Sequence, residues 1–305
     1  MSLDKHYWAY MMFCDFKTST HGKWVLVGEH AVLRGNAAVV YPLRDRRLIL
    51  NYTFGDHPLN VMVSGEQVSD IHGIFLQVLS HASKCLGQSN RLITGTFLLE
   101  NNIPLGVGMG ASAALSVAVA RWFAARDNWS TDQTVLFARE LENLFHGKSS
   151  GLDIAGVSAI SGVVFQQGNS APIEQCWQPN FALSSSGEVG LTAACIERVQ
   201  HLWITDRTQA LSVDAEMQAS VVQAIDALKN RTQNALIALS QAMNRASDCF
   251  VTWGLVSDAL KNKMQILRDA GALAVKPTGS GLGGMIISLW KDPIIPQIDN
   301  TLHLI

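Results

Sequence analysis

The chain has 305 residues, and its 23 Lys and Arg balance 25 Asp and Glu to a formal net charge of −2. A hydrophobic fraction of 48% with only 16% charged residues excludes a disordered chain, and the length suffices for one large α/β domain or two smaller ones. The near-neutral charge argues against a polybasic nucleic-acid or lipid binder and, taken alone, against a polyanionic ligand.

Cysteine usage and hydropathy bound the cellular setting. The five cysteines are widely spaced and form no C-x-x-C pair, which favours free thiols in a reducing compartment over a disulfide or zinc framework. No apolar run reaches about 18 residues, so no membrane span is predicted. The short apolar stretch 7–14 predicts a first strand rather than a signal peptide. We therefore expect a cytoplasmic protein that does not contact membranes. The cysteines are Cys14, Cys85, Cys176, Cys195 and Cys249.

The first half of the chain predicts strands, then a glycine loop, then helices. Apolar residues at helical spacing predict a helix over 71–86, and an Ala-rich run without Gly or Pro predicts a buried helix over 111–125. Ser130 and Gln133 have capping-box spacing ahead of a helix over 132–146, and a further helix begins near Asp153. Short apolar or β-branched runs predict strands at 24–27, 37–40, 48–54, 59–63, 95–99 and 163–166.

The second half predicts a separate α+β arrangement. Residues 167–190 are rich in Ser, Pro, Gly and Asn and predict an inter-domain segment. A strand at 201–205 precedes helices over about 215–246 and 256–270, the latter ended by Gly271 in a C-cap role. Two more strands, at 272–275 and 285–289, enclose a second glycine cluster.

The first glycine cluster lies in residues 104–114, between a predicted strand and a predicted helix. Glycines let backbone N–H groups approach a ligand, and a helix N-terminus adds unpaired donors and a partial positive charge. Together they predict an anion site with phosphate as the usual occupant, although a tight packing turn explains the same glycines. The segment does not contain G-x-x-x-x-G-K-[ST]. It also does not fit the dinucleotide-binding pattern, because Asp127, at about the expected distance, follows a predicted helix rather than a strand.

The second glycine cluster, 276–284, and three charged residues complete the candidate features. Two glycine clusters in separate halves suggest a cleft with a ligand between them, whereas a simple hairpin loop is the alternative. Lys23 begins an apolar strand, where a lysine is usually just solvated, and Glu142 lies late on a predicted helix. Asp153 begins the next helix, either as an N-cap or as a carboxylate directed at a cleft.

In order along the chain, these segments resemble the GHMP kinase superfamily, and within it the mevalonate kinases. The resemblance rests on G-K-x-x-L-x-G-E-H-A-V at 22–32, P-x-G-x-G-x-G-x-S-A-A at 104–114 and K-x-T-G-x-G-x-G-G at 276–284. A fourth anchor is H-G-x-x-S-G-x-D at 146–153. The Glu-His-Ala-Val element with His30 favours mevalonate kinases over phosphomevalonate or homoserine kinases.

The resemblance implies a two-domain α+β fold with the active site in the cleft between the domains. Residues 4–175 would form an ATP-binding domain like ribosomal protein S5 domain 2, and residues 176–305 a ferredoxin-like domain. The implied activity is ATP-dependent phosphorylation of the 5-hydroxyl of mevalonate in isoprenoid synthesis, by a homodimer. Two alternatives stay open: a GHMP kinase for phosphomevalonate, homoserine or a sugar, and a non-catalytic ligand-binding member of the fold.

The resemblance also implies roles for individual residues. Asp153 matches the catalytic aspartate and Lys23 the lysine that contacts it and the transferred phosphoryl group. Ser112 and Glu142 match ligands of Mg²⁺, which prefers hard oxygen donors. The implied ATP-binding residues are Lys23, Gly106, Val107, Gly108, Met109, Gly110, Ala111 and Ser112. The implied substrate residues are Glu29, His30, Thr208, Gly279 and Ser280.

The chain departs from the family pattern at four places. Ala111 replaces a serine and so lacks one hydroxyl for phosphate, whereas Met109 replaces a leucine of similar volume. Lys148-Ser149 stands where Asn-Pro is common. Leu282 replaces a glycine, which adds a side chain to a crowded loop.

Overall fold

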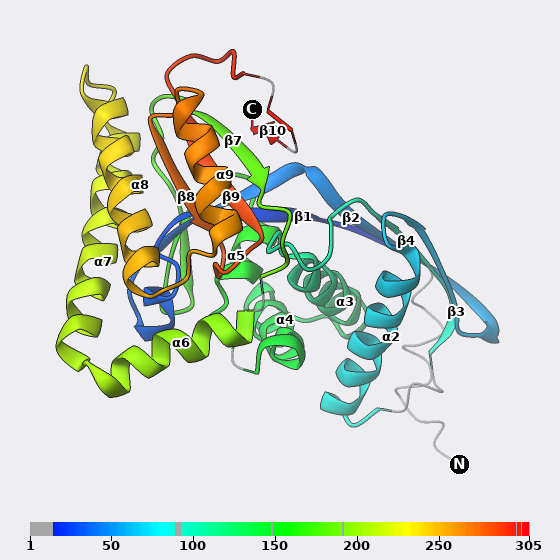
Figure 1. The fold of residues 1–305 in the computed structure, drawn as a ribbon. Coiled ribbons are helices and arrows are strands. Elements are labelled where there is room, and N and C mark those ends of the chain that lie inside the picture. Colours follow the sequence, from blue (N-terminus) through cyan, green and yellow to red (C-terminus); the bar gives the residue numbers. More distant parts are fainter. Residues whose placement is uncertain are drawn as a thin grey trace. The chain divides into compact units, whose positions relative to one another are not determined.

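The computed structural model describes residues 15–88, 93–147, 149–190, 192–296, 298–299 and 301–304 (Figure 1). The chain forms two compact units that alternate along the sequence. Unit 1 comprises the chain up to Gly22 with Leu43–Leu105 and Gly110–Ser158, and unit 2 comprises Lys23–Pro42, Gly106–Met109 and the chain from Ala159. Strands β1 (Asp15–Val27) and β2 (Ala38–Pro58) therefore contribute residues to both units.

Within its described residues, unit 1 combines a sheet with four helices. Strand β3 (Asn60–Gly65) pairs in parallel with β4 (Thr94–Asn101), which pairs antiparallel with the later part of β2. Because β3 and β4 are parallel, the chain crosses between them through a helix. The helices of unit 1 are α2 (Val68–Cys85), α3 (Ala111–Asp127), α4 (Thr131–His146) and α5 (Leu152–Ser158).

Helix α3 forms the centre of unit 1. It packs against α2, α4 and α5, and most of its length is buried because its residues are small or apolar on every side. Its Trp122 lies with its ring centroid 5.1 Å from Phe97 and 5.2 Å from Tyr52, in edge-to-face geometry. This packing fixes the helix that begins directly after the first glycine cluster.

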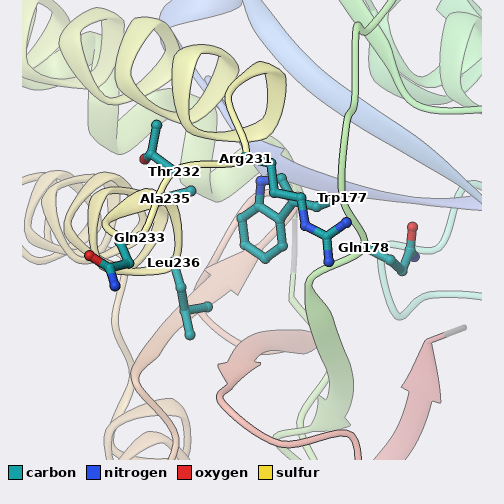
Figure 2. Close-up of a pocket in the computed structure, with 7 residues that line it drawn as sticks. All are labelled: Trp177, Gln178, Arg231, Thr232, Gln233, Ala235 and Leu236. Carbon is teal, nitrogen blue, oxygen red and sulfur yellow. The ribbon is translucent and has the colours of Figure 1, made fainter.

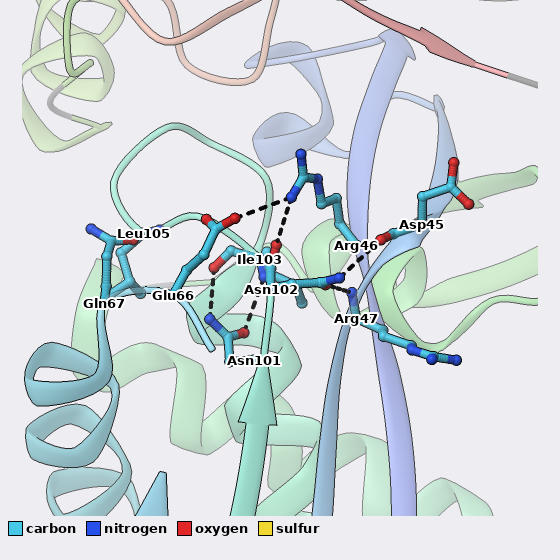
Figure 3. A network of polar contacts seen from close by, with 9 residues as sticks. All are labelled: Asp45, Arg46, Arg47, Glu66, Gln67, Asn101, Asn102, Ile103 and Leu105. Carbon is cyan, nitrogen blue, oxygen red and sulfur yellow. Dashed lines mark hydrogen bonds and ion pairs between the residues drawn. The ribbon is translucent and has the colours of Figure 1, made fainter. Parts of the chain in front are cut away.

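A polar network holds the segment that leads from β4 towards that cluster (Figure 3). Asn102 receives the Arg47 N–H on its Oδ1 at 2.5 Å and donates from its Nδ2 to the Asp45 carbonyl at 3.1 Å. Further along, the Leu105 N–H donates to Gln67 Oε1 at 2.6 Å. The backbone is thus fixed up to the residue before Gly106.

Unit 2 contains a four-stranded antiparallel sheet and, separately, a short ladder. The sheet order is β10 (Thr301–Leu304), β7 (Asn180–Ser185), β9 (Met285–Trp290) and β8 (Ala274–Thr278). In the short ladder, the start of β2 pairs with β5 (Val163–Gln166), which pairs with β6 (Asn169–Pro172). The helices of unit 2 are the 3₁₀ helix η1 (Ala31–Arg34) with α6 (Thr192–Thr205), α7 (Arg207–Lys229), α8 (Ala235–Thr252) and α9 (Asp258–Asp269).

Helices cover this sheet. Figure 1 shows α7 and α8 side by side, and α8 and α9 both contact β8. The amphipathic helix α9 places its apolar residues on β8 and β9 and closes a small core. The buried members of this core are Ala182, Leu260, Met264, Leu267, Val275, Ile286, Trp290 and Ile295.

Most predicted elements are confirmed. The Ser130–Gln133 capping box is present at the start of α4, and Gly271 follows the C-cap of α9 with φ 103°. The strands predicted at 37–40 and 48–54 form parts of one strand, β2. Residues 167–190 include strands β6 and β7 rather than only a linker.

One element is wrong: residues 201–205 belong to α6, not to a strand. The run His-Leu-Trp-Ile-Thr has strand-like composition, but Cys195 and Val199 lie one helical turn apart and bury one face of a helix. The strand predicted at 7–14 and Cys14 lie outside the described residues. The four cysteines in the described ranges are free thiols, of which Cys195 and Cys249 are buried.

The described part of the chain holds no helix that is both long and apolar enough to span a membrane.

Gly28 is required by close packing of two backbones. A Cβ built on Gly28 would lie 2.4 Å from Ala38 Cα, and its φ of +104° is unfavourable for other residues. We expect Gly28→Ala to lower the free energy of unfolding by about 2–4 kcal/mol. The control Gly73→Ala lies in α2, where a Cβ meets nothing within 4 Å, and should stabilise by about 0.5–1 kcal/mol. Chemical denaturation measures both, and equal stability of Gly28→Ala and the wild type contradicts the packing argument.

Candidate active site

The first motif is hydrogen-bonded to both glycine clusters within unit 2. The Lys23 N–H donates to the Met109 carbonyl at 2.8 Å, and the Val25 N–H lies 2.9 Å from Thr278 Oγ1. The Thr278 hydroxyl in turn lies 2.9 Å from the Val25 carbonyl. Lys23 is 3% exposed, so it is not the solvated lysine that its position at a strand start suggests. Strand β1 thus places the two loops side by side.

The second glycine cluster is the loop of the β8–β9 hairpin, because Thr278 pairs with Met285. It adjoins the first cluster: a Cβ built on Gly279 would lie 3.9 Å from the Gly108 carbonyl oxygen. A Cβ on Gly108 would meet nothing closer than the Thr278 carbonyl oxygen at 4.0 Å. Packing therefore does not demand glycine at 108. The backbone φ of +81° favours glycine at this position, and the space that a Gly108 side chain would occupy is open.

In unit 1, helix α3 begins without a side-chain cap. Gly110 occupies the N-cap at φ 81° and offers no side-chain acceptor, so the first N–H groups of α3 lack the usual capping side chain. Ser112 is the second residue of the helix and is half-buried, next to buried Ala111. A long helix with this N-terminus favours binding of an anion.

A buried ion pair joins the first and third motifs. Lys276 Nζ lies 2.5 Å from Glu29 Oε1 and 2.6 Å from the Pro277 carbonyl, and its ammonium lies 5.2 Å from the Phe250 ring centroid. Burial raises the pKa of Glu29 and lowers that of Lys276, and each charge opposes the other's shift. Glu29 Oε2 is buried with no hydrogen-bond partner among the described residues. This oxygen is available to a ligand donor.

His30 is buried beside the second glycine cluster. Its Nε2 lies 2.8 Å from the Ser280 carbonyl, so that nitrogen carries the proton and donates it. Phe250 and Trp253 contact the imidazole edge-to-face, with centroids at 5.8 and 5.2 Å. Burial lowers the pKa of His30 to about 4, so the ring is neutral at pH 7. In this structure His30 holds the loop at Ser280.

Helix α7 supports this turn from one face. Arg34 forms a two-point ion pair with Asp214, with both N–O distances 2.5 Å, and the Gly28 N–H contacts Met217 Sδ at 3.3 Å. Thr208 lies exposed near the start of α7, whereas Asp214 and Met217 lie on its buried face. Glu29, His30 and Ser280 lie in the same unit. Thr208 belongs to that unit as well, but it does not lie on the buried face of α7.

In unit 1, Glu142 is buried and held by the turn between α4 and α5. The Ser149 hydroxyl donates to Glu142 Oε2 at 2.5 Å, and Asn143 Oδ1 accepts the Ser149 N–H at 2.8 Å. Asp153 is the second residue of α5 and therefore not its N-cap. Its half-buried carboxyl group lies in the first turn of that helix.

Sequence reasoning missed the partners of the predicted residues. The third motif, which Lys276 begins, does not by itself connect Lys276 with Glu29, and the sequence shows Ser149 only as a departure from Asn-Pro. Both partners lie inside the quoted motifs, and their position there is the sequence signal that could have found them. Within unit 2 the structure brings together Lys23, Glu29, His30, Gly106–Met109, Gly279 and Ser280; unit 1 holds Gly110, Ala111, Ser112, Glu142 and Asp153.

Unit 2 also has a pocket of about 310 Å³ at the turn between α7 and α8 (Figure 2). Trp177 lines it and is held by its Nε1–H, which donates to the Ala227 carbonyl at 2.8 Å. None of the predicted site residues lines this pocket, so it is not the predicted site.

His30 makes folding stability depend on pH. A histidine with a pKa of about 4 when folded and about 6.5 when unfolded binds its proton only in the unfolded chain between these values. Stability must therefore fall as the pH drops from about 6.5 to about 4, by up to about 3 kcal/mol. Thermal denaturation of wild type and His30→Gln across this range measures the effect. The difference between the two should change with pH, and parallel profiles contradict a buried neutral His30.

Comparison with known proteins connects this geometry with a family. Residues 74–162 match the GHMP kinases N terminal domain. The mevalonate kinase of Aeropyrum pernix is 27% identical over 292 residues, which cover 90% of this chain and 89% of that protein. The mevalonate kinase of Archaeoglobus fulgidus is 28% identical over 279 residues, covering 90% and 92%.

The fold matches as well. The L. major mevalonate kinase in complex with R-mevalonate superposes with a TM-score of 0.76 at 21% identity, over 94% of both chains. The expected GHMP kinase fold is thereby confirmed. By these matches, residues 74–162 carry a GHMP kinases N terminal domain, and over most of its length the chain is similar in sequence and fold to mevalonate kinases.

Proposed function

We propose that the protein transfers the γ-phosphoryl group of ATP to the 5-hydroxyl of mevalonate. One observation carries the proposal: a left-handed glycine loop leads into the uncapped N-terminus of α3, in a chain similar to mevalonate kinases over about nine-tenths of its length. These relatives favour mevalonate over the other acceptors considered, and no feature of the site favours a non-catalytic role.

Residues Gly106 to Ser112 are proposed to bind the ATP phosphates. Phosphoryl transfer depends on positioning and on neutralising the charge of the phosphates. Backbone N–H groups at the open side of Gly108 and at the start of α3 supply donors without a net charge. The bond from the Lys23 N–H to the Met109 carbonyl keeps Lys23 next to this loop.

Asp153 and Lys23 are proposed as the catalytic pair. The Asp153 carboxylate would accept or orient the proton of the attacking hydroxyl, and the Lys23 ammonium would stabilise that carboxylate and the transferred group. Support comes from their places in the two motifs and from the burial of Lys23, which strengthens its electrostatic effect.

Ser112 and Glu142 are proposed to hold Mg²⁺. A hydroxyl and a carboxylate fit this ion, which prefers oxygen donors and binds proteins through few of them. The Ser149 hydroxyl, which donates to Glu142 Oε2, keeps the buried carboxylate in one orientation. When bound, the ion neutralises phosphate charge.

The acceptor is proposed to bind beside the second glycine cluster. Glu29 Oε2, buried without a partner among the described residues, is suited to accept a hydrogen bond from a ligand hydroxyl. His30 would keep Gly279 and Ser280 in place through the Ser280 carbonyl. Thr208 remains part of the proposal only by its resemblance to a substrate position.

Four further features are proposed from the resemblance. Residues 4–175 form the ATP-binding domain and residues 176–305 the second domain, with the active site in the cleft between them. The protein is a homodimer, and it works in the cytoplasm.

Asp153→Asn tests the catalytic role. Loss of the carboxylate should lower kcat about 10²–10⁴-fold, because the amide cannot accept the hydroxyl proton. A coupled ADP-release assay with mevalonate, phosphomevalonate, homoserine and galactose measures it. Asp292→Asn, which neutralises an exposed carboxylate, is the control and should retain wild-type turnover. Near-full activity of Asp153→Asn refutes the catalytic role of Asp153. If the wild type turns over another acceptor but not mevalonate, the assignment of mevalonate as the substrate is refuted.

Gly108→Ala tests the phosphate loop. The added methyl group meets no protein atom closer than 4.0 Å, so it should cost only about 1 kcal/mol of stability through its left-handed backbone. It would occupy the open space before the loop and should raise the KM for ATP at least about tenfold. Gly87→Ala carries a similar backbone strain in another place, with nothing within 4 Å, and should leave KM unchanged. An unchanged KM in both variants would exclude this loop from ATP binding.

A further inference from the structure

A cluster of three side chains of different chemistry lies between helices α2 and α4 of unit 1. His81 and Cys85 are one helical turn apart on α2, so they lie on the same face. Glu140 comes from α4, which packs against α2. One ligand atom from each residue lies within 4.8 Å of the other two. The proposed kinase reaction uses none of these three side chains.

The donor set fits a zinc ion better than an alkaline-earth ion. Imidazole nitrogen, thiolate sulfur and carboxylate oxygen are the ligands of Zn²⁺, whereas Mg²⁺ and Ca²⁺ prefer oxygen alone. Tetrahedral zinc with ordinary Zn–S and Zn–N bonds places sulfur and nitrogen about 3.6 Å apart. Cys85 Sγ lies 3.6 Å from His81 Nε2. The two α2 ligands therefore already have the spacing that a shared ion requires.

A hydrogen bond orients the third ligand, Glu140. The Asn143 side-chain amide donates to Glu140 Oε2 at 3.0 Å, one helical turn along α4. Such outer hydrogen bonds orient metal ligands. A thiolate and a carboxylate together neutralise a divalent ion, so binding releases the thiol proton to solvent and leaves no net charge.

The cluster is distinct from the proposed Mg²⁺ ligand on the same helix. Glu140 is exposed, whereas Glu142 is 1% exposed. Two residues apart on a helix, the side chains differ in direction by about 200°. An ion at Glu140 therefore does not occupy the position of one at Glu142.

We propose that His81, Cys85 and Glu140 bind one Zn²⁺, with water as the fourth ligand, and that the ion links α2 to α4. Each ligand stands on a helix rather than on a loop, which gives the site a defined geometry. A three-ligand site of this kind leaves one position open to solvent.

Metal titration of the full chain tests the proposal. After treatment with EDTA, Zn²⁺ is added in competition with a chromophoric chelator, and Co²⁺ is used as a spectroscopic probe. The wild type should bind one equivalent of Zn²⁺ and release one proton, and Co²⁺ should give a sulfur charge-transfer band. Zn²⁺ should also raise Tm, because it binds only the folded arrangement of the two helices.

Single substitutions decide between a built site and incidental surface binding. Cys85→Ser and Glu140→Gln should each weaken Zn²⁺ binding at least tenfold, and Cys85→Ser should abolish the charge-transfer band. Cys176→Ser removes another exposed thiol, in unit 2, and should leave binding unchanged. The Tm of each variant in EDTA reports whether it folds. Zn²⁺ binding that Cys85→Ser leaves intact, or a wild type without the sulfur band, overturns the proposal.

Discussion

The ion pair between Glu29 and Lys276 is the contact on which the arrangement of unit 2 depends. Both side chains are almost fully buried, so each charge loses its hydration, and the short contact between them helps to offset that cost. Removing either partner would leave a buried charge uncompensated, which typically costs about 3–5 kcal/mol. Lys276 also binds the Pro277 carbonyl, so the pair sets the position of the strand that leads to Thr278.

From this pair the geometry of both glycine clusters follows. Thr278 bonds β1 at Val25, Lys23 bonds the first cluster at Met109, and His30 holds the second cluster at Ser280. These contacts use backbone groups, which suits loops whose N–H groups have to be placed for a ligand rather than screened by side chains. A near-neutral chain can in this way bind a polyphosphate, because backbone donors and a helix terminus do not change the count of Lys and Arg.

Local signals predicted local structure well. Ser130 and Gln133 specify the start of α4 by their own hydrogen bonds. The glycine motifs predicted two loops, of which the first lies between β4 and α3 and the second between β8 and β9. The sequence could not show that Lys276 pairs with Glu29, because 247 residues separate them and neither residue carries a sign of its partner. Residues 201–205 show the same limit. Their composition is typical of a strand, but they continue helix α6, whose earlier residues Cys195 and Val199 are buried. Likewise, the resemblance implies a substrate position at Thr208, but the face of α7 on which Thr208 lies decides what it contacts.

The interleaving of the two units has a consequence for how the chain is made. All residues of unit 1 have been synthesised once Ser158 is added, but Glu29 belongs to unit 2 and its partner Lys276 follows roughly 120 residues later. At about 5–20 residues per second, ribosomes need roughly 6–24 seconds for that distance. During this interval the nascent chain holds a carboxylate destined for burial with no ammonium to meet it. Glu29 therefore stays hydrated until the β8–β9 hairpin leaves the ribosome, and unit 2 can close only late in translation.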